Sequence, residues 1–123
     1  MPRDLDLIRK LLFWIEEHCD GSHTYSSVQV KIEGYSLKEI NLHLSLMKEA
    51  SLICLVPSPR ANPKARNIQF TRLTNEGYEL LDAIRNTSIW NTVKEKVFDL
   101  GGSCALSVVK DLAIQILKLN CHL

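Results

Sequence analysis

The sequence predicts an α+β fold that is mostly helical. Apolar residues recur at the spacing of an amphipathic helix in five segments, and three short segments have the alternation or the apolar run of a strand. In chain order these elements are a helix, a short strand, a helix, a hairpin and three further helices. At 123 residues the chain can bury one hydrophobic core, so we expect one domain with a short appendage.

The composition is that of an ordinary soluble globular protein, with 46% apolar residues, 24% charged residues and a formal net charge of +1. No segment approaches the roughly 20 apolar residues that span a bilayer, and the charged start MPRDLDLIRK is unlike a secretory signal. We therefore expect a cytoplasmic protein that does not associate with membranes. Because the overall charge is nearly neutral, any electrostatic partner has to be met by a local patch.

The first helix is predicted over residues 4–19, with Asp4 as its N-cap. Its apolar positions recur at helical spacing: Leu5, Ile8, Leu11, Leu12 and Ile15. Phe13 and Trp14 widen this stripe beyond what one core contact requires. They fit either a helix that is buried on two sides or a surface for dimerisation, and both interpretations stay open.

A short strand with one buried face is predicted over residues 27–32, where Val28, Val30 and Ile32 alternate with polar residues. The helix after it is clearly marked at its start, because Ser36 and Glu39 form an S-x-x-E capping box. Its apolar face is predicted to hold Leu37, Ile40, Leu44 and Met47, and its polar arc to hold Lys38, Asn41, Ser45 and Lys48. His43 falls among the apolar positions and is expected at the edge of the core.

A long hairpin is predicted next, built from the apolar run SLICLV, a proline-rich stretch and the alternating segment RNIQFTRL. Prolines stiffen such a loop because they fix φ. The hairpin is also basic: from Ser51 to Asn75 there is no Asp or Glu. The cations in this stretch are Arg60, Lys64, Arg66 and Arg72.

Three further helices are predicted in the C-terminal part. The first has Thr74 as its N-cap, the second covers SIWNTVKEKVFDL and stops at Gly101, and the third covers SCALSVVKDLAIQILKLN. We expect residues 1–86 to form one domain. Residues 87–123 are expected to be a helical extension that packs on it or forms a dimer interface.

A helix with a polar arc directly before a basic hairpin is the order of elements in a winged helix-turn-helix. In DNA-binding members the helix enters the major groove, and the hairpin, or wing, follows the phosphate backbone. Two features of this sequence depart from that unit. The usual second helix is shortened or replaced near residues 22–27, and Ser51 in EASLI stands where glycine commonly takes the left-handed position after the recognition helix. We expect this turn to differ or to carry a little strain.

Five segments carry a resemblance to a known family: RDLDLIRKLLFWIEE, IEGYSLKEINLHLSLMKEASLI, RLTNEGYELLDAIRN, IWNTVKEKV and LAIQILK. Over nearly the whole chain, the sequence resembles a family of small bacterial and phage proteins that is catalogued as a domain of unknown function. The resemblance implies a winged-helix-like fold, a bacterial or phage origin and no established activity. RLTNEGYELLDAI is also similar to the L-T-x-x-G segment after the wing of MarR-like and PadR-like transcriptional regulators, which dimerise through terminal helices.

The favoured function is binding of duplex DNA, as in a dimeric transcriptional regulator. Asn can pair with adenine and Lys can reach guanine, so the candidates for base contacts are Lys38, Asn41, Ser45 and Lys48. The candidates for phosphate contacts in the wing are Arg60, Lys64, Arg66 and Arg72. The candidates for a dimer interface, by analogy, are Phe13, Trp14, Trp90 and Ile116.

A protein-interaction module is the main alternative, because winged helices also bind proteins. A phage-type protein could inhibit or redirect a host protein through the surplus apolar positions Phe13, Trp14, Trp90 and Phe98. An enzyme is not expected, since the sequence has no nucleophile elbow, phosphate loop or G-x-G-x-x-G motif. The four cysteines form no Cys-x-x-Cys pair and are expected as free thiols, and the spacing of His and Cys predicts no metal site and no cofactor.

Overall fold

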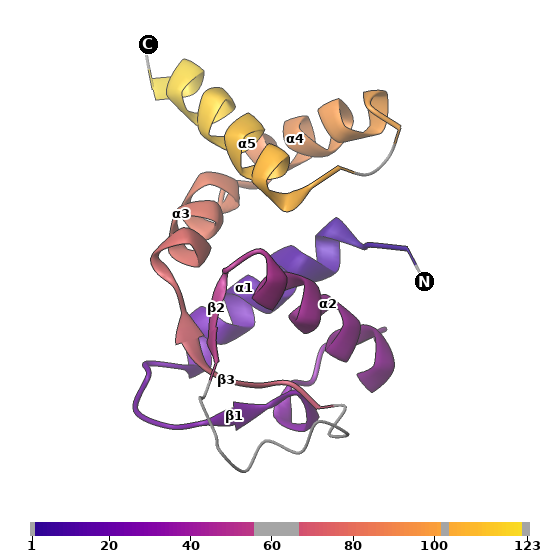
Figure 1. Ribbon diagram of the computed structural model, residues 1–123. Coiled ribbons are helices and arrows are strands. Elements are labelled where there is room, and N and C mark those ends of the chain that lie inside the picture. The colour runs from indigo at the N-terminus through magenta and orange to yellow at the C-terminus, as the bar shows by residue number, and fades with distance from the viewer. Residues whose placement is uncertain (1, 56–66, 102–103, 122–123) are drawn as a thin grey trace. The chain divides into compact units, whose positions relative to one another are not determined.

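The protein is mostly helical with one small sheet, which agrees with the predicted α+β class (Figure 1). The computed structural model describes residues 2–55, 67–101 and 104–121. The chain forms two compact units, Met1–Gly77 and Tyr78–Leu123. The first unit contains α1 (Leu5–His18), β1 (Tyr25–Ser26), the 3₁₀ helix η1 (Ser27–Gln29), α2 (Leu37–Glu49), β2 (Ile53–Leu55) and β3 (Gln69–Leu73). Helix α3 (Asn75–Ile84) leads into the second unit, which continues with α4 (Thr87–Asp99) and α5 (Leu106–Cys121).

The core of the first unit lies between α1, α2 and the sheet. Asp4 caps α1 as predicted, since its carboxylate accepts the backbone N–H of Leu7 at 3.1 Å. Four positions of the predicted α1 stripe are buried and Leu5 is half-buried, and α1 contacts both α2 and β3. The large apolar side chains that are fully buried here are Leu7, Leu11, Leu12, Ile15, Leu44, Met47, Phe70 and Leu73.

The sheet is antiparallel, with the strand order β1-β3-β2. The predicted hairpin pairing of the two strands around the proline-rich stretch is confirmed, and Ile53 lies opposite Leu73. The pairing shifts along the ladder, because Cys54 lies opposite Arg72 while the next residue lies opposite Phe70. Thr71 is thus the extra residue of an irregular ladder, and the strict alternation expected for this strand is interrupted.

The strand predicted over residues 27–32 is wrong. Ser27–Gln29 form a 3₁₀ turn, and the short strand β1 precedes it. Ser26 and Gln29 make a capping box, so a local helix-start signal outweighs the alternation of the valines. Residues two apart in a strand lie on the same face, but Val30 is buried whereas Val28 is 45% exposed.

The start of α2 is as predicted, with the reciprocal capping box of Ser36 and Glu39. The prediction that Leu37 faces the core is wrong, because its side chain is 44% exposed. Leu37 is the first residue of the helix and therefore lies beyond the end of the core. Ile40, His43, Leu44 and Met47 form the buried face instead.

Helix α2 ends in a Schellman motif. Leu52 N–H donates to the carbonyl of Met47 at 2.8 Å, and Ser51 N–H donates to that of Lys48 at 2.9 Å. Ser51 adopts the left-handed conformation with φ 60°. This is the position that glycine commonly takes after the recognition helix of a winged helix. Since a non-glycine residue is uncommon there, this turn stores modest backbone strain.

The loop after α2 is fixed to the start of α3. The carbonyl of Leu52 accepts the backbone N–H of Thr74 at 3.0 Å, and Thr74 Oγ1 accepts the N–H of Gly77 at 3.1 Å. A Cβ at residue 77 would come within 2.2 Å of the Leu52 carbonyl oxygen. Glycine is thus required at this position because another backbone passes too close for a side chain.

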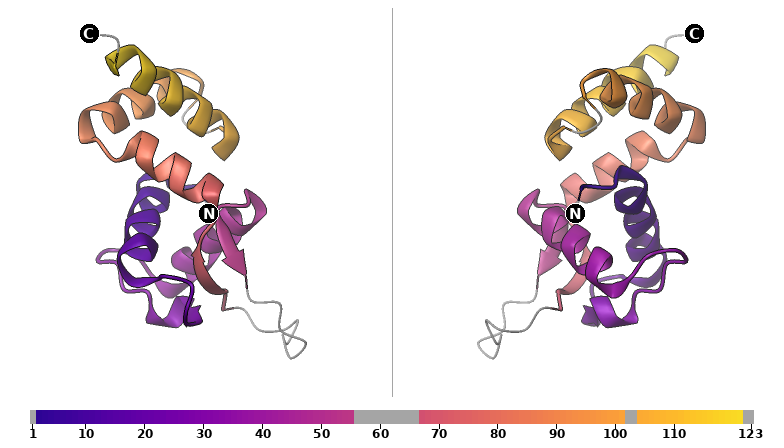
Figure 2. Two further views of the ribbon diagram at one scale, coloured as in Figure 1. Left: turned by 90° about the vertical axis from the view of Figure 1, so that its left-hand side faces the viewer. Right: turned by 90° about the vertical axis from the view of Figure 1, so that its right-hand side faces the viewer.

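The second unit is helical, and Figure 2 shows α4 and α5 side by side from two directions. The stripe predicted for α4 is buried: Trp90, Val93 and Val97. Asn86 caps this helix through hydrogen bonds from the N–H groups of Ser88 and Ile89. Lys110 of α5 pairs with Glu79 of α3 at 2.8 Å.

We predict that Gly77→Ala destabilises the protein. In an ordinary helix the same change adds up to about 1 kcal/mol of stability. Here the new methyl group meets the Leu52 carbonyl, and we expect a loss of about 1–3 kcal/mol in the free energy of unfolding, measured by urea denaturation. Glu76→Ala, an exposed neighbour in α3, is the control and should change stability by about 0.5 kcal/mol or less. A Gly77→Ala variant more stable than the wild type would contradict this packing.

Candidate nucleic-acid interface

The outward side of α2 carries the four polar residues that were predicted to contact bases. They lie three or four positions apart and share one side of the helix: Lys38, Asn41, Ser45 and Lys48. The two lysines are exposed, whereas Asn41 and Ser45 are half-buried. The lysines are therefore the parts of this surface that reach furthest into solvent.

The buried side of α2 is held to α1 through His43, which is only 1% exposed. Its Nε2 accepts the backbone N–H of Asp4 at 2.8 Å, and its Nδ1 lies 2.7 Å from the carbonyl oxygen of Glu39. A backbone N–H can only donate and a carbonyl can only accept. These partners therefore fit a neutral ring with its proton on Nδ1.

Asp4 makes a second connection to the segment before α2. The Tyr35 hydroxyl donates to Asp4 Oδ2 at 2.9 Å, while Oδ1 of the same carboxylate caps α1. Burial, together with this hydrogen bond to Asp4, raises the pKa of Tyr35 to about 12. The hydroxyl thus stays protonated and remains a donor at neutral pH. Asp4, Tyr35 and His43 together set the orientation of α2 on α1.

The outward side of α2 is connected to the hairpin through Asn41. Asn41 Nδ2 donates to Asn67 Oδ1 at 3.1 Å, and Asn41 Oδ1 accepts the backbone N–H of Ile68 at 3.3 Å. Residues 67 and 68 directly precede β3. The base of the hairpin is therefore attached to the surface that carries the exposed lysines.

Of the four cations predicted for the wing, the structure describes Arg72. Arg72 lies in β3. Its Nη1 donates to the carbonyl of Leu73 at 2.8 Å, and its side chain lies beside Gly21. Arg60, Lys64 and Arg66 lie outside the described residues. The structure thus gathers the α2 candidates on one surface and places Arg72 at the base of the hairpin.

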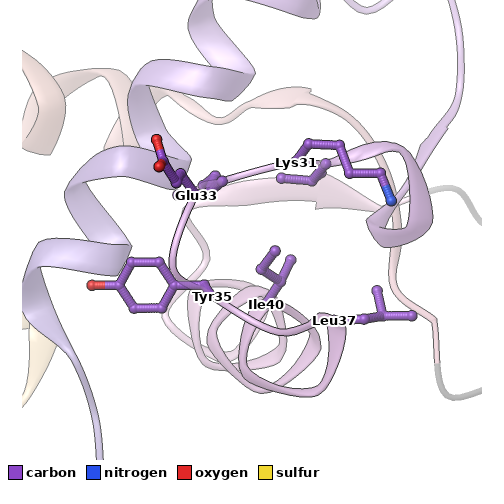
Figure 3. Close-up of a pocket in the computed structure, with 7 residues that line it drawn as sticks. Lys31, Glu33, Tyr35, Leu37 and Ile40 are labelled. Atoms are coloured by element: carbon purple, nitrogen blue, oxygen red, sulfur yellow. The ribbon is translucent and has the colours of Figure 1, made fainter.

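A cavity of about 430 Å³ opens between residues 30–35 and the first turn of α2. It is lined by Val30, Lys31, Ile32, Glu33, Tyr35, Leu37 and Ile40. Figure 3 shows Ile40 pointing into it from α2, with Lys31 and Glu33 on opposite sides. Its lining combines apolar side chains with one cation and one anion. Sequence reasoning missed it because residues 27–32 were assigned to a strand, although Glu33-Gly34 before the capping box is a turn signal.

Comparison with known proteins identifies the family of this chain. The model of the family described as "Hypothetical protein (DUF2513)" matches residues 2–103, which include every element from α1 to α4. The chain belongs to this family. A relative from Haemophilus influenzae (strain Rd), named "Uncharacterized protein", is 28% identical over 118 residues, which cover 96% of this chain and 97% of the relative. No solved structure matches the chain.

The resemblance to a family of unknown function is thereby confirmed. The DUF2513 match includes α2, the cavity and the hairpin, so all the candidate surfaces of the first unit lie inside the family region. The family match says nothing of the MarR-like and PadR-like regulators, so the resemblance to them stays a prediction. The family description itself names no ligand or activity.

The residues predicted for a dimer interface differ in their surroundings in this DUF2513 member. Trp14 is half-buried, and its ring stacks on His18 with centroids 4.1 Å apart and meets Tyr25 and Phe70 edge-on. Trp14 thus packs over the sheet, as in the interpretation of a helix buried on two sides.

The other three dimer candidates differ in how far their side chains are exposed. Phe13 is half-buried beneath the guanidinium of Arg9. Trp90 is 3% exposed and offers little surface to a partner, while Ile116 is half-buried on α5. Ile116 therefore has more surface to offer to a second subunit than Trp90.

Thiols and metal ligands were the remaining candidates for chemistry. Among the residues that the structure describes, no three His, Cys, Asp or Glu side chains gather as metal ligands would. No helix in the described ranges is long and apolar enough to cross a membrane. Cys19, Cys54 and Cys104 are free thiols. Burial, with a smaller contribution from Asp20, raises the pKa of the Cys19 thiol to about 11.

We predict that Cys19 is the slowest of these three thiols to react with iodoacetamide at about pH 8. The thiolate is the reactive species. Cys19 is buried, and a pH of about 8 lies well below the pKa of its thiol. Because its pKa is raised, its labelling should accelerate as the pH rises towards 11. Site-resolved mass spectrometry over time measures the three rates, and unfolding in urea should make them similar. Labelling of folded Cys19 as fast as that of half-buried Cys54 would contradict the prediction.

Proposed function

We propose that the first unit is a winged-helix domain and that the protein is a small DNA-binding regulator of bacterial or phage origin. The observation that carries the proposal is the exposed polar surface of α2, with Lys38 and Lys48, directly before a hairpin segment that has no acid. The sheet order β1-β3-β2 around α1, η1 and α2 supports it. In this interpretation η1 takes the place of the usual second helix.

In the proposed complex α2 lies in the major groove. Lys38 and Lys48 contact guanine or the phosphates beside it, and Ser45 lies between them on the same surface. The hairpin cations Arg60, Lys64, Arg66 and Arg72 contact the phosphate backbone. Binding then depends mainly on charge contacts to phosphate.

The near-neutral total charge is compatible with this proposal. From Ser51 to Asn75 the chain has four cations and no acid, so its segment charge of +4 leaves −3 for the rest of a total of +1. Exposed charges are screened over about 8 Å at physiological salt. A phosphate beside the hairpin therefore senses the local cations far more than acids elsewhere on the chain.

A second candidate function is the binding of a host or phage protein. Phe98 is 78% exposed, Leu119 is 72% exposed and Leu100 is 62% exposed, all in the second unit. Exposed apolar groups of this kind mark protein contacts when they form a patch. A winged helix by itself does not imply DNA binding, and an apolar contact would respond far less to salt.

We also propose that the protein is a homodimer that pairs through its last helix. Ile116 is half-buried on α5, where Leu112 and Leu117 are also half-buried. Such partly covered apolar positions can be completed by a second copy of the same helix. The regulators that the L-T-x-x-G segment resembles also dimerise through terminal helices.

We predict that the protein binds a random labelled duplex in a steeply salt-dependent manner. Each cation that neutralises a phosphate adds roughly 0.9 to the slope with which the logarithm of the binding constant falls with the logarithm of the salt concentration. Changing Lys38 and Lys48 to Glu should therefore abolish binding. Changing Arg60, Lys64 and Arg66 to Glu should do the same. Fluorescence anisotropy at about 50 and 200 mM salt measures this, with the duplex upstream of the protein's own gene as a second probe.

The control is the double variant of Lys96 and Lys118 to Glu, two exposed lysines of the second unit. It makes the same change in net charge as the α2 variant and should leave binding nearly unchanged. Equal losses in both double variants would reduce the effect to net charge. No wild-type binding at the lower salt would contradict the DNA proposal and favour the protein-binding candidate.

We predict that Ile116→Lys yields a folded monomer. A charge on the apolar contact of a dimer is costly because it would be buried without a partner. Gln115→Lys, at the exposed neighbouring position, is the control and should leave the dimer intact. Sedimentation velocity with circular dichroism on each variant measures association and helix content. A wild-type protein that sediments as a monomer would exclude the dimer.

A further inference from the structure

Asn41 of α2 has both parts of its amide engaged with the base of the hairpin. Its Nδ2 donates to Asn67 Oδ1 at 3.1 Å, and its Oδ1 accepts the N–H of Ile68 at 3.3 Å. We name these two hydrogen bonds the Asn41 link. The N–H of Ile68 can only donate, so the amide orientation is fixed with its oxygen towards Ile68.

This orientation conflicts with the obvious role of an asparagine on a recognition helix. Bidentate pairing with adenine needs a donor and the acceptor of one amide at the same time. In Asn41 the oxygen is turned to the hairpin backbone and the nitrogen to Asn67. Reading a base with the edge of the amide that faces residues 67 and 68 would require both bonds to be exchanged. That exchange leaves the half-buried Ile68 N–H without its partner.

We propose that Asn41 is a positioning residue that sets the direction of the hairpin relative to α2. The inference rests on the proposed DNA-binding function, and it assigns Asn41 a role other than base contact. The peptide groups of Ile68 are held from two sides. Its N–H donates to Asn41, and its carbonyl accepts the N–H of Ser27 in η1 at 2.9 Å.

The location of the link decides what it controls. The strand pairing of Ser26 with Gln69 and the bond from Ser27 remain when Asn41 is removed. Only the attachment to α2 is lost, so the sheet forms while the hairpin is less fixed with respect to the lysine surface. If α2 and the hairpin contact one duplex together, a fixed hairpin lowers the ordering cost of binding.

The first test needs no DNA. Hydrogen exchange of the Ile68 amide, followed by NMR, should accelerate in Asn41→Ala because that amide loses its acceptor. Ser45→Ala, on the same side of α2, is the control and should leave the exchange of Ile68 unchanged. Unchanged Ile68 exchange in Asn41→Ala would overturn the link itself.

The second test measures binding of a random duplex by anisotropy. We expect Asn41→Ala to weaken binding about three- to tenfold, because both hydrogen bonds of the link are lost and the hairpin then has to be ordered on binding. Asn67→Ala removes part of the link from the hairpin side, so it should weaken the wild type but add nothing once residue 41 is alanine. A role in reading bases predicts instead that Asn67→Ala has no effect.

A third comparison separates positioning from general structural damage. In a hairpin-neutral variant, with Arg60, Lys64 and Arg66 changed to Ala, the hairpin has little left to position. Asn41→Ala should then lose its effect on affinity. An effect of the same size in this background would overturn the inference.

The failure of this inference can be told apart from failure of the proposed function. If wild-type protein binds no duplex, the proposed function and the DNA role of Asn41 are both overturned, whereas the exchange of Ile68 still decides whether the link exists. If wild-type protein binds DNA and either the Asn67 test or the hairpin-neutral test gives the contrary result, only the positioning role is overturned.

Discussion

The carbonyl oxygen of Leu52 is the point on which the arrangement of α2 and the hairpin depends. Leu52 follows the left-handed Ser51 that ends α2, and its carbonyl accepts the N–H of Thr74 at the end of the hairpin. Gly77 allows the first turn of α3 to pass directly over this oxygen. The end of α2 and both ends of the hairpin therefore meet at one place. The register that begins with Ile53 opposite Leu73 follows from that junction.

The other half of α2 is fixed by polar contacts to α1. Asp4 caps α1, accepts the Tyr35 hydroxyl and donates its own backbone N–H to His43. A buried polar group is costly unless it is paired, and here both ring nitrogens of His43 have partners at 2.8 and 2.7 Å. Helix α2 is thus held at its end by backbone geometry and in its first half by this polar group. Its rotation, and with it the direction of the lysine surface, is determined by contacts inside the first unit.

The sequence was sufficient for the features that have local signals. Helix starts at Asp4 and Ser36 were predicted from capping residues. For Ser51 the sequence left open a different turn or a strained one, and the strained left-handed turn is the one observed. The misplaced strand had a competing local signal, the Ser26–Gln29 capping box, that alternation concealed. The Asn41 link joins residues 26 positions apart, and helical periodicity reports only that Asn41 lies outside the apolar face. No local pattern distinguishes an amide that binds its own chain from one that reads a base.

That distinction changes what the α2 surface can recognise. Once Asn41 is engaged with Asn67 and Ile68, the polar groups left on this side of the helix are Lys38, Ser45 and Lys48. A lysine ammonium is a compact charge on a flexible stem and recognises phosphate without the fixed geometry of a planar group. A surface with two lysines and one hydroxyl therefore has much capacity for phosphate and little for bidentate base readout. In the proposed complex with DNA, binding therefore rests mainly on charge and shape. Sequence preference would have to come from the proposed pairing of two copies or from DNA deformability.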